Sequence, residues 1–342
     1  MVDSDLVSGT SRLYRALSAD DAVFALSQTC AASCVHQVLV TSDGYEWRTM
    51  ADQIRNADSV EDLGFADGRY VAVGMAGGAA IWTSLGSLWS RNEQPTIFDA
   101  GADGGPAQPS NHNDVPVRIH ALATGPGGWL AGGSVSCDDC LLEPGDLPSR
   151  YAAWLSADGH TWSRAPWHPG PASINRLAFN GTTYVALDNE GLWNSADAEH
   201  WQRVLEIDPE TASMVDVAER AGEFLAVAHD TPQAVAIWTS TDGSNWTRVP
   251  PSAEFGGVSP VRLQSLSGRW VLVGSREITG DVPAQSVWTS TDGQTWSRQT
   301  VATNESGHVA DAGAIGQTLV ASGWLGDGGP STMGAAWVGS LP

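Results

Sequence analysis

One motif, W-T-S-x-D-G-x-x-W-x-R, recurs along this chain and constrains its fold more than any other feature. Full copies run from Trp238 to Arg248 and from Trp288 to Arg298, and close variants run from Trp154 to Arg164 and from Trp193 to Arg203. Weaker copies surround Asp43, Trp82 and Trp337. A repeat of this length predicts a solenoid, a propeller or another array of units that pack on their neighbours.

Each repeat reads as short β-strands joined by tight turns. The sixth unit contains four strand-like runs, which are Val261–Leu266, Trp270–Gly274, Ser286–Ser290 and Thr295–Arg298. The turn before the last run holds Asp-Gly, a strong hairpin signal because Gly accepts positive φ and Asp bonds nearby N–H groups. No stretch shows a helical period. Four antiparallel strands per unit are typical of a propeller blade.

The sequence therefore predicts an all-β, seven-bladed β-propeller of four-stranded antiparallel blades, forming one domain over residues 1–342. The expected units are about 10–50, 57–93, 116–166, 172–205, 212–250, 257–300 and 307–342. The last unit ends after its third strand. Either Met1–Gly9 supplies the missing outer strand and closes the ring, or the last blade has three strands.

The S-x-D-G-x-x-W core resembles the Asp-box (BNR) repeat of sialidases, sortilin-type receptors and photosystem II assembly factors. The resemblance implies that the Asp box lies in the turn between the third and fourth strands, opposite the usual ligand face. It therefore implies turn-stabilising roles for Asp43, Asp158, Asp197, Asp242 and Asp292. The paired Trp residues are expected to fill space between blades. A shared fold does not assign a function.

The charge of the chain excludes two classes of partner. The formal net charge is -22 and the basic side chains are all Arg, which argues against nucleic acid or an anionic membrane as a partner. No apolar run is long enough for a membrane helix, and Met1–Ser18 carries charges where a signal peptide needs an apolar core. We expect a monomer without membrane insertion.

The four cysteines fall in two close pairs, Cys30 with Cys34 and Cys137 with Cys140. Each pair lies in an expected loop between the second and third strands of its own unit. Two disulfides would fit an oxidising compartment, so we expect a secreted or surface-attached protein in its mature form. The alternative, one zinc ion held by four thiolates, would join loops of non-adjacent units. We predict no metal and no cofactor.

Long loops on the face opposite the Asp boxes are where a ligand site is expected. They span residues 94–115, 136–150, 167–172 and 276–285, and the third contains His168. The alternative is that these loops are solvent-exposed and have no functional role. Asp99, Asp103 and Asp114 match no calcium-binding loop.

Aligning the expected first strands predicts a ring of polar side chains around a central channel. One residue per blade contributes to it: Arg15, Asp62, His120, Arg176, Asp216, Gln264 and Asp311. Two residues earlier, Arg118 and Arg262 stand among apolar residues. We predict that these two arginines bind an anion, while the three aspartates pair with Arg15 and Arg176. The ligand-binding candidates are Arg118, Arg262, His120, Arg15, Arg176 and Gln264.

The function that this pattern favours is a binding propeller for a glycan, a small anionic molecule or a protein. The alternative is a carbohydrate-active enzyme. His120 could be the base of a polysaccharide lyase, or Asp62, Asp216 and Asp311 could supply a glycosidase acid/base pair. A sialidase is disfavoured because Val117-Arg118-Ile119-His120 lacks the Pro of the sialidase F/Y-R-I-P motif. A structural scaffold is the third possibility.

Overall fold

The protein is built from seven antiparallel sheets, six of four strands and one of three among the described residues. The computed structural model describes residues 10–30, 33–50, 53–85, 88–99, 102, 117–125, 127–136, 149–230, 234–276, 284–300, 307–326 and 332–341. The sheets confirm the predicted seven-bladed β-propeller. Two short 3-10 helices, Pro95–Phe98 and Ala253–Phe255, are the helices of the described part. No described segment is a helix long and apolar enough to span a membrane.

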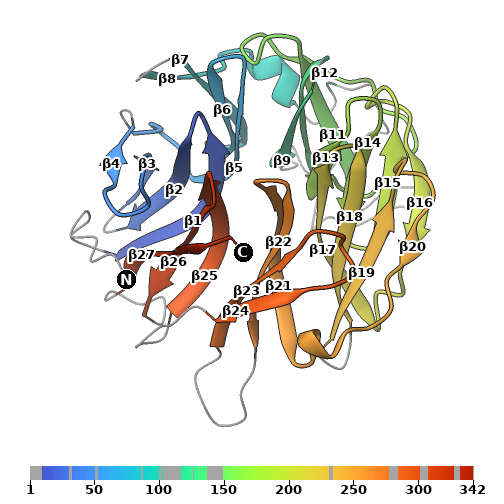
Figure 1. Cartoon of the computed structure of the whole chain (residues 1–342). Helices are drawn as coiled ribbons and strands as arrows, with labels where there is room; N and C mark the ends of the chain where they lie inside the picture. Colours follow the sequence, from blue (N-terminus) through green and yellow to red (C-terminus); the bar gives the residue numbers. More distant parts are fainter. Residues whose placement is uncertain are drawn as a thin grey trace. The chain divides into compact units, whose positions relative to one another are not determined.

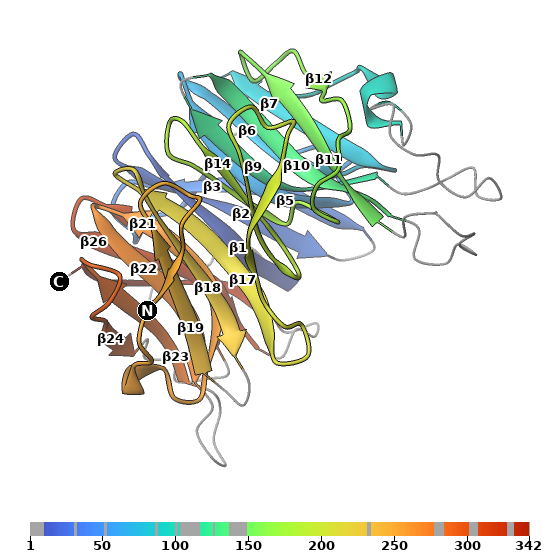
Figure 2. The same cartoon turned by 90° about the vertical axis from the view of Figure 1, so that its right-hand side faces the viewer.

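The chain divides into two compact units, and the first contains Met1–Arg55, Glu210–Ser240 and Thr247–Pro342. Its blade 1 consists of β1 (Thr10–Ala19), β2 (Ala22–Cys30), β3 (Cys34–Thr41) and β4 (Arg48–Thr49). Blade 5 consists of β17 (Ala212–Arg220), β18 (Glu223–Asp230), β19 (Ala234–Ser240) and β20 (Thr247–Arg248). Blade 6 consists of β21 (Val258–Leu266), β22 (Arg269–Arg276), β23 (Ala284–Ser290) and β24 (Ser297–Thr300). Blade 7 consists of β25 (Gly307–Ile315), β26 (Thr318–Leu325) and β27 (Met333–Ser340). Figure 2 shows two of these sheets, β17–β19 and β21–β23, as successive layers.

The second unit contains Asn56–Pro209 and Thr241–Trp246. Blade 2 consists of β5 (Ser59–Ala66), β6 (Arg69–Met75), β7 (Ala79–Leu85) and β8 (Leu88–Arg91). Blade 3 consists of β9 (Val117–Gly125), β10 (Gly128–Ser136), β11 (Ser149–Ser156) and β12 (Ser163–Arg164). Blade 4 consists of β13 (Arg176–Phe179), β14 (Tyr184–Asp188), β15 (Gly191–Ser195) and β16 (Gln202–Glu206).

Within the first unit, blade 7 packs directly on blade 1 (Figure 1). The backbone N–H of Ala16 donates to Asp311 Oδ2 at 3.0 Å, and the N–H of Ala314 donates to Ser18 Oγ at 2.8 Å. These bonds join residues separated by almost the whole chain. Met1–Gly9, the expected closing strand, lies outside the described residues.

The leading Trp of each motif occupies one register position in the third strand. In six blades a Trp stands opposite a residue of the second strand in the pairs Ala72–Trp82, Ala131–Trp154, Ala186–Trp193, Ala226–Trp238, Leu272–Trp288 and Ala321–Trp337. Blade 1 has Leu39 opposite Ala25. Five of the partners are alanines, whose small side chains leave space for the indole, so most of these Trp rings are buried.

In blades 3, 4 and 5 the Arg that ends the motif covers the Trp that begins it. Strand pairing sets Arg164 beside Trp154, and its guanidinium carbon lies 4.4 Å from the indole centroid. Arg203 and Arg248 stack in the same way on Trp193 and Trp238, at 4.8 and 5.5 Å. A cation over an indole face is attracted by the ring quadrupole, so these pairs close the outer edge of the blade.

In blades 1, 3, 4, 5 and 6 the turn between the third and fourth strands, here called the Asp turn, is held by one carboxylate. Asp158 Oδ1 accepts the N–H groups of His160 and Thr161, both at 2.8 Å, while Ser156 Oγ accepts the N–H of Gly159 at 2.8 Å. Gly159 has a φ of 68°, which suits glycine. Two backbone N–H groups are accepted in the same way by each of Asp43, Asp197, Asp242 and Asp292.

These turns predict a loss of stability in acid. Hydrogen bonds from the N–H groups of Thr161 and His160 lower the pKa of Asp158 to about 2, and similar bonds lower the pKa of Asp43 and Asp292. A lowered folded-state pKa contributes stability above the unfolded pKa of about 3.9, and this contribution disappears as the pH falls toward the folded value. We expect a thermal midpoint that falls between about pH 4 and pH 2, and Asp158→Asn should reduce this dependence. A midpoint equally pH-dependent in wild type and variant would contradict the prediction.

A disulfide joins Cys30 and Cys34, which face each other at the β2–β3 connection. This pair confirms one of the two predicted bridges. Cys137 and Cys140 lie outside the described residues.

Candidate functional site

In each first strand with a β-bulge, one residue has no strand partner. The residue after it occupies the position of the predicted ring. In blades 1, 5, 6 and 7 the bulge precedes Arg15, Asp216, Arg262 and Asp311. Taken in the spatial order of blades 5, 6, 7 and 1, the first unit therefore presents a row of Asp, Arg, Asp and Arg. We call these four residues the charged row.

The aspartates at this position, Asp216, Asp311 and Asp62, connect neighbouring blades by accepting hydrogen bonds from backbone N–H groups. Asp216 Oδ1 accepts the N–H of Val217 at 2.9 Å, and its Oδ2 accepts the N–H of Leu263 in the next blade at 2.8 Å. Asp311 accepts from Ala312 at 2.9 Å and from Ala16 at 3.0 Å. In the second unit, Asp62 bonds Leu63 at 2.9 Å and Leu122 at 3.0 Å. All three side chains are buried, so each bond satisfies a group that water does not reach.

The expectation that Arg262 has no acidic neighbour is wrong. Its Nη1 lies 3.2 Å from Asp216 Oδ2, and its Nε lies 3.8 Å from Asp311 Oδ2. Arg262 belongs to the charged row rather than to an apolar level above it. Burial raises the pKa of Asp311, while Arg262 and Arg15 lower it. The row in the first unit is therefore an internal network of opposite charges.

The expected ring alignment is also wrong in two blades. In blade 6 the ring position belongs to Arg262, and Gln264 lies two residues later, where its Nε2 donates to Asp311 Oδ1 and to the carbonyl of Ala312. In blade 3 His120 is the bulge residue, and Ala121 takes the ring position. The aspartates accept backbone N–H groups, and Arg15 also lowers the pKa of Asp311, while the predicted pairing with Arg176 stays a prediction. Side-chain spacing cannot reveal these shifts, because a bulge inserts a residue that leaves no mark in the apolar pattern.

The second unit gathers a different set of charges on the first strands of blades 2, 3 and 4. Burial lowers the pKa of His120, Glu61 raises it, and Arg118 and Arg176 lower it further. His120 Nε2 lies 3.4 Å from Ser134 Oγ, and Ser134 is the strand partner of Arg118. Arg176 lies two residues after the buried Ile174, as Arg15 lies two residues after the buried Leu13 in blade 1. We call Arg118, His120 and Arg176 the basic cluster.

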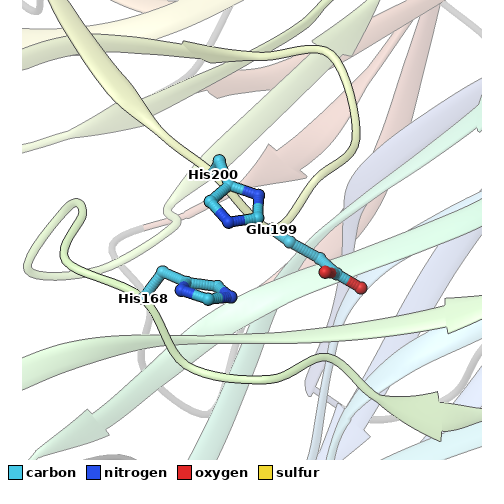
Figure 3. A group of neighbouring side chains, drawn as sticks. All are labelled: His168, Glu199 and His200. Carbon is cyan, nitrogen blue, oxygen red and sulfur yellow. The ribbon is translucent and has the colours of Figure 1, made fainter.

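A second constellation was not predicted from the sequence. His168, Glu199 and His200 lie together in the second unit, with one ligand atom of each within 4.8 Å of the others (Figure 3). The sequence places His168 in a long loop, whereas Glu199 and His200 lie in the Asp turn of blade 4 and are not among the predicted site residues. The only sequence signal was a Glu-His pair at this point of the repeat. Of the other loop residues, Asp103 and Asp114 lie outside the described residues.

The family of the chain follows from its sequence. A family model for the DUF6242 β-propeller domain matches residues 140–320, more than half of the chain. The chain belongs to this family. No curated protein matches this DUF6242 propeller in sequence.

Solved structures share the fold of this DUF6242 propeller at low identity. YCF48 from Cyanidioschyzon merolae is 13% identical with a TM-score of 0.55, and the match covers 93% of this chain and 94% of that one. A Trypanosoma rangeli sialidase, solved with sialic acid, is 10% identical with a TM-score of 0.51 and coverages of 98% and 55%. Pyrococcus horikoshii acylaminoacyl peptidase is 10% identical with a TM-score of 0.54 and coverages of 94% and 52%. The chain thus spans about half of the sialidase and of the peptidase, and these likenesses show the fold alone.

Proposed function

We propose that this protein is a binding propeller for an acidic ligand, such as an acidic glycan or a small carboxylate, held by the basic cluster. The observation that carries the proposal is the gathering of Arg118, His120 and Arg176 on the first strands of consecutive blades. Guanidinium groups present fixed forks of donors that match carboxylates and sulfates. Ser134 adds a hydroxyl beside His120 at 3.4 Å.

The contrast between the two units supports this choice of site. In the first unit, Arg262 faces the carboxylates of Asp216 and Asp311, so its charge serves the fold. In the second unit, the equivalent position of blade 3 is Ala121, whose methyl group replaces a charged side chain. The alternation of Asp and Arg is therefore broken where the basic cluster lies. Two arginines from adjacent first strands can then approach one anion from two sides.

Replacing Arg118 tests the proposal. We expect Arg118→Ala to weaken binding of glucuronate or sulfate at least tenfold, because a charge-assisted hydrogen bond is worth about 1.5–3 kcal/mol and about 1.4 kcal/mol equals a factor of ten. Its unfolding midpoint should stay near that of the wild type. Titration calorimetry with glucuronate, sulfate and neutral glucose provides the measurement.

Arg262→Ala is the matched control, since it removes the same side chain from a first strand of the other unit. It should lower the unfolding midpoint and keep the affinity for glucuronate. Equal affinity in wild type and Arg118→Ala, or equal loss in the two variants, would refute the proposed site.

A lyase is the second candidate, and one observation favours it. Burial lowers the pKa of His120, Glu61 raises it, and Arg118 and Arg176 lower it, and the net lowering favours the neutral imidazole. A neutral imidazole between carboxylate-binding arginines is suited to removing the proton beside a uronic acid carboxylate. Incubation with uronic acid polysaccharides would reveal it by the ultraviolet absorbance of the unsaturated product. Binding without product would leave the binding function.

We place the protein outside the cytoplasm, as a monomer that meets a glycan, a small anion or a protein. The Cys30–Cys34 disulfide supports an oxidising compartment. We also assign the Asp turns to the Asp-box type, supported by the shared pattern of carboxylate acceptors. Fractionation of the native host, followed by alkylation without reductant, tests the location, because a cytoplasmic, fully reduced protein would contradict it.

A further inference from the structure

The segments that carry His168 and His200 are brought together by one buried side chain. The hydroxyl of Tyr151 donates to the carbonyl of Glu199 at 3.0 Å and accepts the N–H of His168 at 3.3 Å. Tyr151 is 1% exposed, and its ring packs edge-on against Trp201. The loop before blade 4 and the Asp turn of blade 4 are therefore both fixed to the same anchor. Side chains on two such segments keep a defined spacing.

The two imidazole rings are stacked with centroids 4.1 Å apart and an interplanar angle of 30° (Figure 3). A neutral imidazole is the form that binds a metal ion. The carboxylate of Glu199 extends beside the rings and completes a set of two nitrogens and one oxygen.

The orientation of His200 is set by a carboxylate behind it. His200 Nδ1 lies 2.9 Å from Asp197 Oδ2, while Asp197 Oδ1 accepts the N–H groups of Glu199 and His200. The N–H at Nδ1 donates a hydrogen bond to the carboxylate, which leaves the lone pair of Nε2 directed away from Asp197. A carboxylate that orients the outer nitrogen of a histidine ligand is a recurrent feature of protein metal sites.

We propose that His168, Glu199 and His200 form a binding site for a first-row transition-metal ion of the Zn²⁺ class. Two imidazoles and one carboxylate are a common protein ligand set for zinc with an open fourth position. Ligand atoms around such an ion lie about 3.3 Å apart. The ligand atoms lie within 4.8 Å of one another, and rotation of the Glu199 side chain brings its carboxylate closer to the two rings while the Asp197 contact holds His200. Ca²⁺ and Mg²⁺ prefer oxygen ligands and do not suit this set.

Calorimetric titration of the full chain, purified without a histidine tag, with Zn²⁺ is the first experiment. The wild type should bind one Zn²⁺ at this site, and Ca²⁺ should give no heat of binding. His168→Ala and His200→Ala should each weaken the zinc affinity at least tenfold. If zinc were held elsewhere, for example by Cys137 and Cys140, both variants would bind it as tightly as the wild type does. That result would overturn the proposal. His160→Ala is the matched control, since His160 is an exposed histidine in the Asp turn of blade 3 and should bind zinc as the wild type does.

Asp197→Asn tests the positioning role of the carboxylate. The amide oxygen can still accept turn N–H groups, but the amide nitrogen donates toward Nδ1 and so forces the proton onto Nε2. We expect a loss of zinc affinity of about 10–100-fold. Asp158→Asn makes the same change in the Asp turn of blade 3 and should keep the zinc affinity. Melting curves of all variants show which remain folded, and unchanged zinc affinity in folded His168→Ala would refute the site.

Discussion

Asp216→Ala should lower the free energy of unfolding by about 3–5 kcal/mol, the cost of breaking a buried charge pair by removing one partner. The carboxylate is 1% exposed and accepts the N–H groups of Val217 and Leu263 while facing Arg262 at 3.2 Å. Its removal leaves two buried donors and one guanidinium without these acceptors. Chemical denaturation followed by Trp fluorescence gives the measurement.

Asp230→Ala is the control for this change. Asp230 forms an ion pair with Arg248 in blade 5, and the Arg248 side chain is 52% exposed. Solvent screens such a pair, so we expect a loss below about 1 kcal/mol. Similar losses in the two variants would show that the charged row does not stabilise the blades.

Trp154→Ala should destabilise the protein by about 3–5 kcal/mol, as large-to-small changes in a packed core do. Trp154 is 0% exposed, its Nε1 donates to the carbonyl of Ile97 at 2.8 Å, and Arg164 stacks on its face. The change opens a cavity beside Ala131 and removes the surface on which Arg164 rests. Denaturant titration at equilibrium tests the expected loss.

Tyr45→Ala provides the comparison, because it removes an aromatic ring that is 58% exposed from the Asp turn of blade 1. The expected change is within about 0.5 kcal/mol. If Trp154→Ala were equally harmless, the Trp positions of the repeat would have a role other than packing.

The architecture could be predicted because the repeat marks positions that recur in most blades. The leading Trp enters the third strand in six blades, and Asp followed by Gly or Ala marks the turn after the third strand in blades 1, 3, 4, 5 and 6. Both signals act over a few residues, since a Trp facing Ala131 or Ala226 and a carboxylate bonding the next two N–H groups need only local chain. The expected blade starts therefore agree with the observed first strands to within a few residues.

The candidate site was predicted less well because it depends on register between strands. A single bulge residue, His120 in blade 3, moves Ala121 into the ring, and an error of two positions in blade 6 hid the role of Arg262. Apolar spacing carries no trace of these shifts. The ion pairs of Arg262 became visible only with the aspartates of the neighbouring blades in place.

The histidine cluster could not be predicted at all from the motif. Its geometry depends on Tyr151, a buried residue of blade 3 that contacts two segments far from it in sequence. The positions of Glu199 and His200 hold different residues in the other copies of the motif, so the motif does not mark these two residues as ligands.

The bond between Ala16 and Asp311 also bears on how the protein is made. The acceptor for this N–H is synthesised 295 residues after the donor. At a ribosomal rate of about 5–20 residues per second, β1 waits on the order of 15–60 seconds for its partner blade. During that interval Leu13 and Ala16 of β1 lack the blade 7 residues on which they pack, and pairing over such a separation is slow. Nascent chains of this protein are therefore expected to depend on chaperones until blade 7 emerges.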